Sequence, residues 1–122
     1  MNIAEFQAQA GYVTVTIDYR LTTDHRFPAQ IEDCKAAVRW LRANAKKYKV
    51  DPERIGVIGF SAGGHLACPL GTTTKADGFD GDGGNAEQSS AVQAVVSVAG
   101  PTALSTDDWF AEKWKTGMLL AV

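Results

Sequence analysis

The sequence predicts an α/β fold in which helices cover a mainly parallel sheet as a three-layer sandwich. Three stretches have the residue pattern of strands, at positions 12–19, 55–60 and 93–99, and helical patterns separate them. Strands that alternate with helices are typical of parallel sheets joined by right-handed crossovers. A chain of 122 residues suffices for one core and is short for two, so we expect a single domain over residues 1–122.

The first half of the chain carries a helix end, a strand and a long helix. Residues 3–10 are expected to end a helix at Gly11, because glycine is favoured just beyond the last helical turn. Tyr12–Tyr19 alternates β-branched residues with polar ones, which predicts a strand. From Pro28 to about Tyr48, apolar side chains recur at helical spacing. We expect the opposite, solvated face of this helix to carry Lys35, Arg39, Arg42, Lys46 and Lys47.

The second half supplies the other two strands. Pro52 disfavours helix for the residue before it and marks a turn. The apolar runs at 55–60 and 93–99 do not alternate with polar residues. Such runs are typical of parallel strands that are covered on both faces.

Helices and a loop fill the rest of the second half. A helix is expected from Ala62 to about Thr72, kinked or ended early at Pro69. Residues 75–90 are rich in Gly, Asp and Ser and predict a loop. Its acidic residues fail the EF-hand spacing, so we expect a solvated loop rather than a calcium site; they are Asp77, Asp80 and Asp82. A short helix near 106–115 contains aromatic residues that either line an acyl pocket or cover the core, namely Trp109, Phe110 and Trp114.

The composition is that of an ordinary globular protein, with 45% hydrophobic and 21% charged residues. A formal net charge of -2 gives no reason to expect nucleic acid or an anionic membrane as a partner. No signal-peptide pattern and no apolar stretch of about 20 residues is present, so we expect a cytoplasmic protein with no membrane partner. Cys34 and Cys68 form no CxxC or Cys/His cluster. They are expected to be free, buried thiols in a reducing compartment.

Residues 59–63 read Gly-Phe-Ser-Ala-Gly and fit the pattern G-x-S-x-G. A strand pattern precedes them and a helical pattern follows, which is the setting of a nucleophile elbow. In such a turn Ser61 is the nucleophile, held on a strained backbone above the carboxyl end of the sheet. The alternative is an incidental serine in a tight glycine turn.

The neighbours of Ser61 have expected supporting roles. Gly59 and Gly63 omit side chains that would collide with the adjacent strand and helix, and Gly64 gives extra clearance. The helix that begins at Ala62 points free N–H groups toward developing negative charge. We therefore expect the Ala62 N–H to donate a hydrogen bond to an oxyanion.

Other segments follow one another in an order that resembles a known family. They are residues 18–21 (DYRL), 25–29 (HRFPA), 32–33 (ED), 40–41 (WL), 51–55 (DPERI), 59–67 (GFSAGGHLA), 80–85 and 95–101 (VVSVAGP). Together they resemble α/β-hydrolase esterases related to hormone-sensitive lipase and to the acetyl-xylan and feruloyl esterase-like group. The resemblance covers nearly the whole chain and implies a partial α/β-hydrolase fold of about three strands and three to four helices.

The resemblance also implies an activity. It implies a carboxylic-ester hydrolase of short acyl esters with a Ser-His-Asp triad, an acyl-enzyme intermediate and no metal or cofactor. In the family the acid and then the histidine follow the serine, and a His-Gly-Gly-Gly-type segment supplies further oxyanion donors. Only Ser61 and the Ala62 N–H carry over residue by residue. The chain resembles the middle third of such an enzyme, so we expect a truncated and very poor esterase.

Three further titratable residues have a structural and a catalytic interpretation. His65 lies one helical turn beyond Ser61 and is expected to pack, with a role as general base as the alternative. The resemblance implies that His25 lies near the rim of the site rather than acting in catalysis. Asp33 is expected to anchor the loop before its helix rather than to serve as the triad acid.

The resemblance finally indicates a gap in the sheet. In the family, the strand leading into the His-Gly-Gly-Gly segment lies between the strands matching 12–19 and 55–60, and here it is missing. We therefore expect an unsatisfied edge and a homo-oligomer. The expected ligand is a small-molecule ester. The alternatives are a catalytically inactive, self-associating fragment and a peptidase of the same fold.

Overall fold

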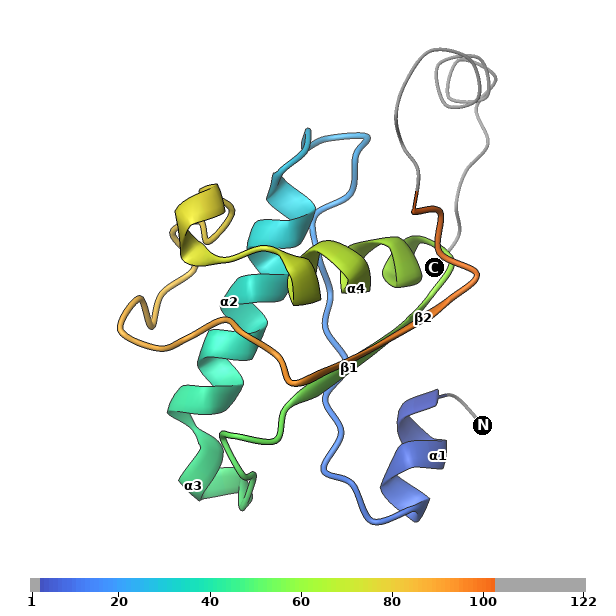
Figure 1. The fold of residues 1–122 in the computed structure, drawn as a ribbon, viewed down its shortest axis with the longest axis vertical. Coiled ribbons are helices and arrows are strands. Elements are labelled where there is room, and N and C mark those ends of the chain that lie inside the picture. The colour runs from blue at the N-terminus through green and yellow to red at the C-terminus, as the bar shows by residue number, and fades with distance from the viewer. Residues whose placement is uncertain (1–2, 103–122) are drawn as a thin grey trace.

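The computed structural model describes residues 3–102, which form helices around a short parallel sheet (Figure 1). In chain order the elements are α1 (Ile3–Gln9), α2 (Ala29–Ala43), α3 (Ala45–Tyr48), β1 (Gly56–Phe60), α4 (Ala62–Thr72), the 3₁₀ helix η1 (Lys75–Asp77) and β2 (Ala94–Val98). The helix expected near 106–115, with its three aromatic residues, lies outside the described residues.

The sheet consists of β1 and β2, which pair in parallel with Ile58 opposite Val96. α4 connects them and packs on both strands. Figure 1 shows α2 and α4 on one side of this sheet and α1 on the other. This arrangement confirms the predicted α/β class with parallel strands joined through a helix.

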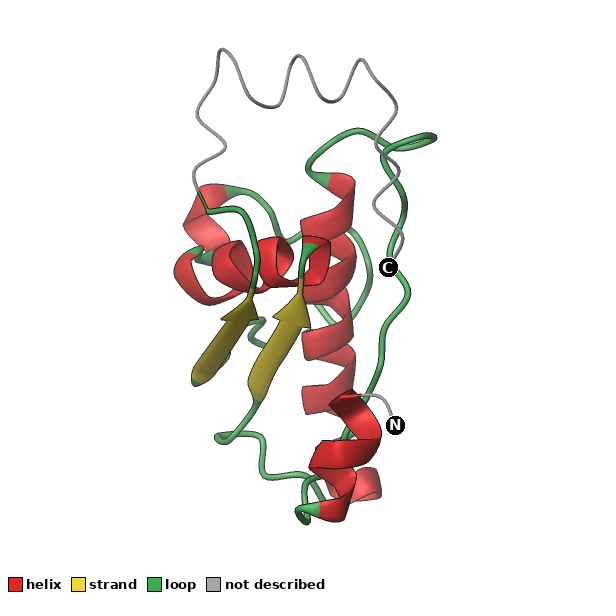
Figure 2. Cartoon of the chain, turned by 90° about the vertical axis from the view of Figure 1, so that its right-hand side faces the viewer, coloured by secondary structure: helices red, strands yellow, loops and turns green. Residues whose placement is uncertain are grey.

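The predicted strand at Tyr12–Tyr19 is wrong. The segment is extended, but no strand is assigned to it. Figures 1 and 2 together show it running on the side of β1 opposite β2, separated from β1. A strand requires a neighbour that completes its hydrogen-bond ladder, and residues 3–102 provide none here. The alternating apolar side chains of the segment consequently remain exposed, among them Val13, Val15 and Ile17.

The core lies between α2, α4 and β1. Ile31, Cys34 and Val38 project from α2 and meet Leu66 and Leu70 of α4. Cys34 is buried and Cys68 is half-buried, and both thiols are free, as predicted. Burial raises the pKa of the Cys34 thiol to about 11, with a further contribution from the neighbouring Asp33 charge.

The solvated face predicted for α2 is wrong at Lys35 and Arg39, which are both fully buried. The Lys35 ammonium group donates to the Thr73 carbonyl and the Ser90 hydroxyl, at 3.1 and 3.3 Å. Arg39 donates to the carbonyls of Asp80 and Gly84, at 2.7 and 2.9 Å. The chain after α4 folds back over this face, and the two cations satisfy its backbone groups.

The long helix differs from the prediction, whereas α4 has the predicted bounds of Ala62–Thr72. The long helix is interrupted at Asn44, whose φ of -102° and ψ of 11° separate α2 from α3. α4 does not end early, because Pro69 lies inside it and its carbonyl accepts a hydrogen bond from the Thr73 N–H. No helix in residues 3–102 is long and apolar enough to cross a membrane.

The expectation that both faces of β1 and β2 are covered is wrong for the described part of the chain, since residues 3–102 leave one face of the sheet open. Val57 packs against the core, and an added Cβ at Gly71 of α4 would run into the side chain of Val95. Because successive side chains of a strand point to opposite faces, the intervening residues point away from α4. The exposed apolar residues on this open face are Ile58, Phe60, Val96 and Val98.

Candidate active site

Ser61 occupies the tight turn between β1 and α4, at the carboxyl end of the sheet. Its φ is 54° and its ψ is -114°, which is rare for a residue with a side chain. Such a backbone costs on the order of 1–3 kcal/mol and persists only where the surroundings hold it. The Ser61 N–H donates a 2.8 Å hydrogen bond to the Val98 carbonyl at the end of β2.

The close approach of β1 and α4 requires glycine at some of the predicted positions. An added Cβ at Gly59 would overlap the carbonyl group of Gly63. One at Gly64 would lie 3.0 Å from both the Gly100 Cα and the Val98 carbonyl oxygen. At Gly63 an added Cβ would meet no atom within 4 Å. The prediction that a side chain at Gly63 would collide with its surroundings is therefore wrong. The backbone carbonyl of Gly63 is instead the group that a side chain at Gly59 would strike.

The Ser61 hydroxyl is not used to cap α4, since it forms no capping hydrogen bond with that helix. The His65 backbone N–H donates a hydrogen bond to the Ser61 carbonyl, and this is the first hydrogen bond of the α4 ladder. The N–H groups of Ala62 and Gly63 come earlier in the chain than His65 and therefore have no acceptor within the helix. A hydroxyl and free N–H groups thus meet at the positive end of the helix dipole, where negative charge is stabilised.

His65 faces the segment after β2 rather than solvent alone. Its Nδ1 lies 2.9 Å from the Pro101 carbonyl oxygen. Because a carbonyl only accepts hydrogen bonds, Nδ1 carries the proton of this bond, and in the neutral ring Nε2 then has the lone pair. Within residues 3–102, the hydrogen bonds found for the His65 side chain do not include one to Ser61. His25 lies in the exposed loop before α2, where its backbone carbonyl accepts from Gln30.

Asp33 anchors the loop that precedes α2, as predicted. Its carboxylate accepts hydrogen bonds from the Arg20 backbone N–H at 2.8 Å and from the Arg20 guanidinium group at 3.0 and 3.1 Å. The guanidinium hydrogen bond is the main reason that the pKa of Asp33 lies below its usual value. The hydrogen bonds of this carboxylate thus go to Arg20, and the nearby His25 adds a smaller charge interaction that also lowers the pKa of Asp33.

Two of the three acidic loop residues, Asp77 and Asp80, have individual structural partners. Asp77 caps η1 by accepting from the N–H and the hydroxyl of Thr74. Asp80 forms an ion pair with Lys35 at 3.3 Å, so the predicted solvated loop is wrong for this residue. Among residues 3–102, no group of three His, Cys, Asp or Glu side chains is arranged to hold a metal ion.

Ser97 is a residue of this site that the sequence did not single out. Its hydroxyl donates a 2.9 Å hydrogen bond to the Gly64 carbonyl in the first turn of α4. A small polar residue in an apolar strand was the available signal, but the strand pattern alone does not say which side chain faces α4.

The family model BD-FAE matches residues 1–119. The chain belongs to the BD-FAE family. The fold agrees, since the BD-FAE chain aligns with a solved "truncated form of carbohydrate esterase from gut microbiota" at 40% identity and a TM-score of 0.67. That alignment covers 70% of this chain and 34% of the solved one.

Curated relatives of the BD-FAE chain are also named as esterases or deacetylases. Esterase LipC of Mycobacterium tuberculosis is 40% identical over 93 residues, which are 76% of this chain and 23% of LipC. Arylacetamide deacetylase of Oryctolagus cuniculus is 53% identical over 60 residues, which are 48% of this chain and 15% of that protein. The chain therefore spans less than a quarter of the length of these two relatives.

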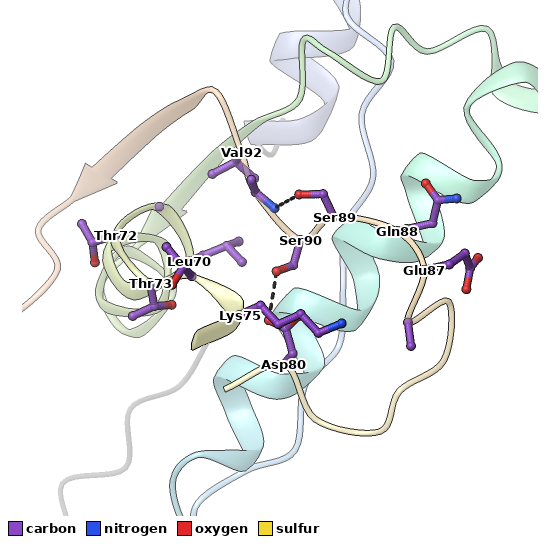
Figure 3. Close-up of a pocket in the computed structure, with 14 residues that line it drawn as sticks. Leu70, Thr72, Thr73, Lys75, Asp80, Glu87, Gln88, Ser89, Ser90 and Val92 are labelled. Carbon is purple, nitrogen blue, oxygen red and sulfur yellow. Dashed lines mark hydrogen bonds between the residues drawn. The ribbon is translucent and has the colours of Figure 1, made fainter. Parts of the chain in front are cut away.

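The BD-FAE chain also has a hollow that does not include Ser61. It lies between the end of α4 and the loop before β2 (Figure 3). The Ser90 hydroxyl there donates to Asp80 at 3.1 Å, and both groups also contact Lys35. Ser90, Asp80 and Lys35 already bind one another, so none of these three side chains is left to bind a ligand in the hollow.

Proposed function

We propose that this chain carries the nucleophile of a serine carboxylic-ester hydrolase, and that the nucleophile is Ser61. The observation that carries the proposal is the strained backbone of Ser61 at a strand-to-helix turn, with a hydroxyl that does not cap α4. This geometry supports a nucleophile elbow, which presents a serine hydroxyl at the end of a parallel sheet. Membership of the BD-FAE family and the names of the relatives support ester hydrolysis.

The proposed reaction proceeds through an acyl-enzyme. Ser61 Oγ attacks the ester carbonyl carbon while a general base takes the hydroxyl proton, and the Ala62 N–H donates to the resulting oxyanion. The tetrahedral intermediate collapses and expels the alkoxide, which takes that proton from the base and leaves as the alcohol. Water then attacks the acyl-enzyme with the help of the same base, which releases the acid and returns a proton to Ser61 Oγ. Nε2 of His65 is the candidate base within this chain, because Nδ1 is engaged with Pro101. Gly59, Gly63 and Gly64 support the turn through their backbones.

The proposed substrates are esters of short acids. The rabbit relative is named for arylacetamide, which contains an acetyl group, and this supports a short acyl chain. The same name refers to an amide, so the peptidase alternative is tested alongside. Comparing p-nitrophenyl acetate, p-nitrophenyl octanoate and p-nitroacetanilide separates a short-acyl esterase, a long-acyl esterase and an amidase. We expect the acetate ester to be cleaved fastest. Faster cleavage of the anilide would favour an amidase or peptidase.

The esterase proposal is tested with Ser61→Ala and, as a matched control, Ser89→Ala in the exposed loop. Losing triad members typically leaves about 10³–10⁴-fold acceleration over water, and losing an oxyanion donor costs about 10²–10³-fold more, so the expected turnover of p-nitrophenyl acetate is weak. Ser61→Ala should reduce it to the rate without protein, and Ser89→Ala should not change it. Equal turnover by the wild-type chain and Ser61→Ala would exclude Ser61 as the nucleophile.

We also propose that residues 1–122 act as a single partial domain that self-associates. The open face of the sheet supports this, because its apolar residues are exposed, Phe60 by 59%. The unpaired segment Tyr12–Tyr19 supports it further. Sedimentation velocity at micromolar concentration should give a dimer or larger species, and a monomer would contradict the proposal. The two free thiols support a reducing compartment such as the cytoplasm.

A further inference from the structure

The first turn of α4 is joined to the chain at the end of β2 by three hydrogen bonds. The Ser61 N–H donates to Val98, as described above, and this bond involves the backbone alone. The other two use side chains: Ser97 Oγ donates to the Gly64 carbonyl, and His65 Nδ1 donates to the Pro101 carbonyl, each at 2.9 Å. The two side-chain bonds run in opposite directions, one from β2 to α4 and one from α4 to the segment after β2.

Between these bonds the two backbones are in direct contact. A Cβ added to Gly100 would lie 2.5 Å from the backbone nitrogen of His65 and 2.6 Å from Ser97 Oγ. A Cβ added to Gly64 would lie 3.0 Å from Gly100 Cα and 3.0 Å from Ser97 Oγ. Ser97 Oγ therefore sits at the crossing of the two backbones, where only glycines fit on either side.

Two strained residues lie at this crossing. Ser61 has a φ of 54° and Ala99 a φ of 53°, and neither is a glycine. Positive φ is costly for such residues, and it persists only when surrounding contacts over-determine the backbone. The contacts that could do so here are the hydrogen bonds on both sides of the crossing and the glycine-to-glycine packing between them.

We propose that Ser97 and His65 are positioning residues, whose side-chain hydrogen bonds hold Ser61 in its strained backbone conformation. The catalytic consequence rests on the proposed function of Ser61, whereas the structural part does not. His65 then acts through Nδ1 and Pro101, and its Nε2 is not required for positioning. This assigns His65 a role that a side chain without any basic nitrogen can perform.

Conservative and disruptive variants test the proposal at each position. Ser97→Ala removes the donor, whereas Ser97→Thr keeps a hydroxyl on the same Cβ. His65→Phe removes the Nδ1 donor, whereas the side-chain amide of His65→Asn provides an N–H near the same place. Ser89→Ala again serves as the control.

The first readout is amide hydrogen exchange, measured by NMR on the full chain. Losing one hydrogen bond of ordinary strength corresponds to roughly a tenfold change. Ser97→Ala and His65→Phe should therefore speed exchange of the Ser61 N–H by about tenfold, with the amides of α2 unchanged. Ser97→Thr and His65→Asn should restore protection. If Ser97→Ala does not fold, the two His65 variants give the same comparison.

The second readout is the rate of Ser61 labelling by a fluorophosphonate. The rate should fall about tenfold in Ser97→Ala and return in Ser97→Thr. His65→Asn should keep the exchange protection of the Ser61 N–H but label slowly, because it restores the hydrogen bond to Pro101 and lacks Nε2, the proposed base. If the wild type does not label but the exchange pattern is as expected, the proposed function fails and the positioning role stands. Unchanged Ser61 exchange in both disruptive variants, or an equal loss of protection throughout α2, would overturn the proposal.

Discussion

Lys35 Nζ of α2 lies 3.3 Å from the Asp80 carboxylate in the loop before β2, and the lysine side chain is completely buried. This ion pair attaches the loop to α2, which supplies Ile31, Cys34 and Val38 to the core. The loop leads into β2, and the end of β2 contacts the turn that contains Ser61. The pair therefore supports the site from a distance through the strand.

Asp80→Asn should destabilise the chain. The variant leaves the buried Lys35 charge without its counter-ion, and breaking a buried pair typically costs about 3–5 kcal/mol. We expect the lower end of this range, because the Asp80 side chain retains 19% exposure and the Ser90 hydroxyl remains a partner. Urea unfolding measures the loss. Asp82→Asn in the exposed part of the same loop is the control, and an equal effect of both variants would contradict this assignment.

Gly59→Ala and Gly63→Ala should have opposite effects, although both glycines belong to the G-x-S-x-G pattern. The first variant places a Cβ on the Gly63 carbonyl and should cost about 3 kcal/mol or more through overpacking against backbone. The second meets no atom within 4 Å and replaces glycine in a helix, so it should be neutral or stabilising by up to about 1 kcal/mol. Thermal unfolding of the pair decides the matter; destabilisation by Gly63→Ala would count against the described turn.

Cys34 should resist thiol reagents in the folded chain. Burial raises its pKa to about 11, so the reactive thiolate is scarce at pH 8. Iodoacetamide followed by peptide mass mapping should modify Cys68 first and Cys34 only after unfolding.

The raised pKa of the Cys34 thiol also favours the folded state while the thiol is neutral. This contribution is complete below the unfolded value of about 9 and is lost as pH rises toward 11. Cys34→Ser should weaken the alkaline loss of stability.

The Arg20–Asp33 pair should contribute to acid unfolding. Because the pKa of Asp33 is lowered in the folded chain, the pair stabilises the fold above the unfolded value of 3.8 and loses its effect as pH falls through the lowered value. Asp33→Asn should therefore reduce the melting temperature at pH 7 and flatten its decline below about pH 4. The effect should be small, since both side chains are partly exposed. A profile of Asp33→Asn parallel to that of the wild type between pH 2.5 and 7 would contradict it.

Local patterns predicted the elements that depend on local interactions. The C-terminal end of α1 follows from Gly11, and the start of α4 follows from the residues around Ser61. The strand predicted at Tyr12–Tyr19 was wrong because alternation describes a side-chain pattern, whereas a strand also needs a neighbouring chain. The solvated face of α2 was wrong at Lys35 and Arg39 for a similar reason. Burial there depends on a distant segment that folds back over the helix.

The candidate site divides in the same way. The Ser61 turn could be predicted because its chemistry is encoded in consecutive residues. The contacts of Ser97 and His65 could not, since they depend on how two backbones cross between α4 and the end of β2. Neither residue type identifies such a crossing on its own, because serine and histidine are also common at ordinary surface positions.

The most direct test of the central claim is covalent labelling of the purified chain with a fluorophosphonate, read by intact mass. If Ser61 is an activated nucleophile, one label per chain should accumulate on the wild type and on Ser89→Ala, and none on Ser61→Ala. Absence of labelling on the wild type, or labelling that persists in Ser61→Ala, would contradict the claim that Ser61 is the nucleophile of this chain.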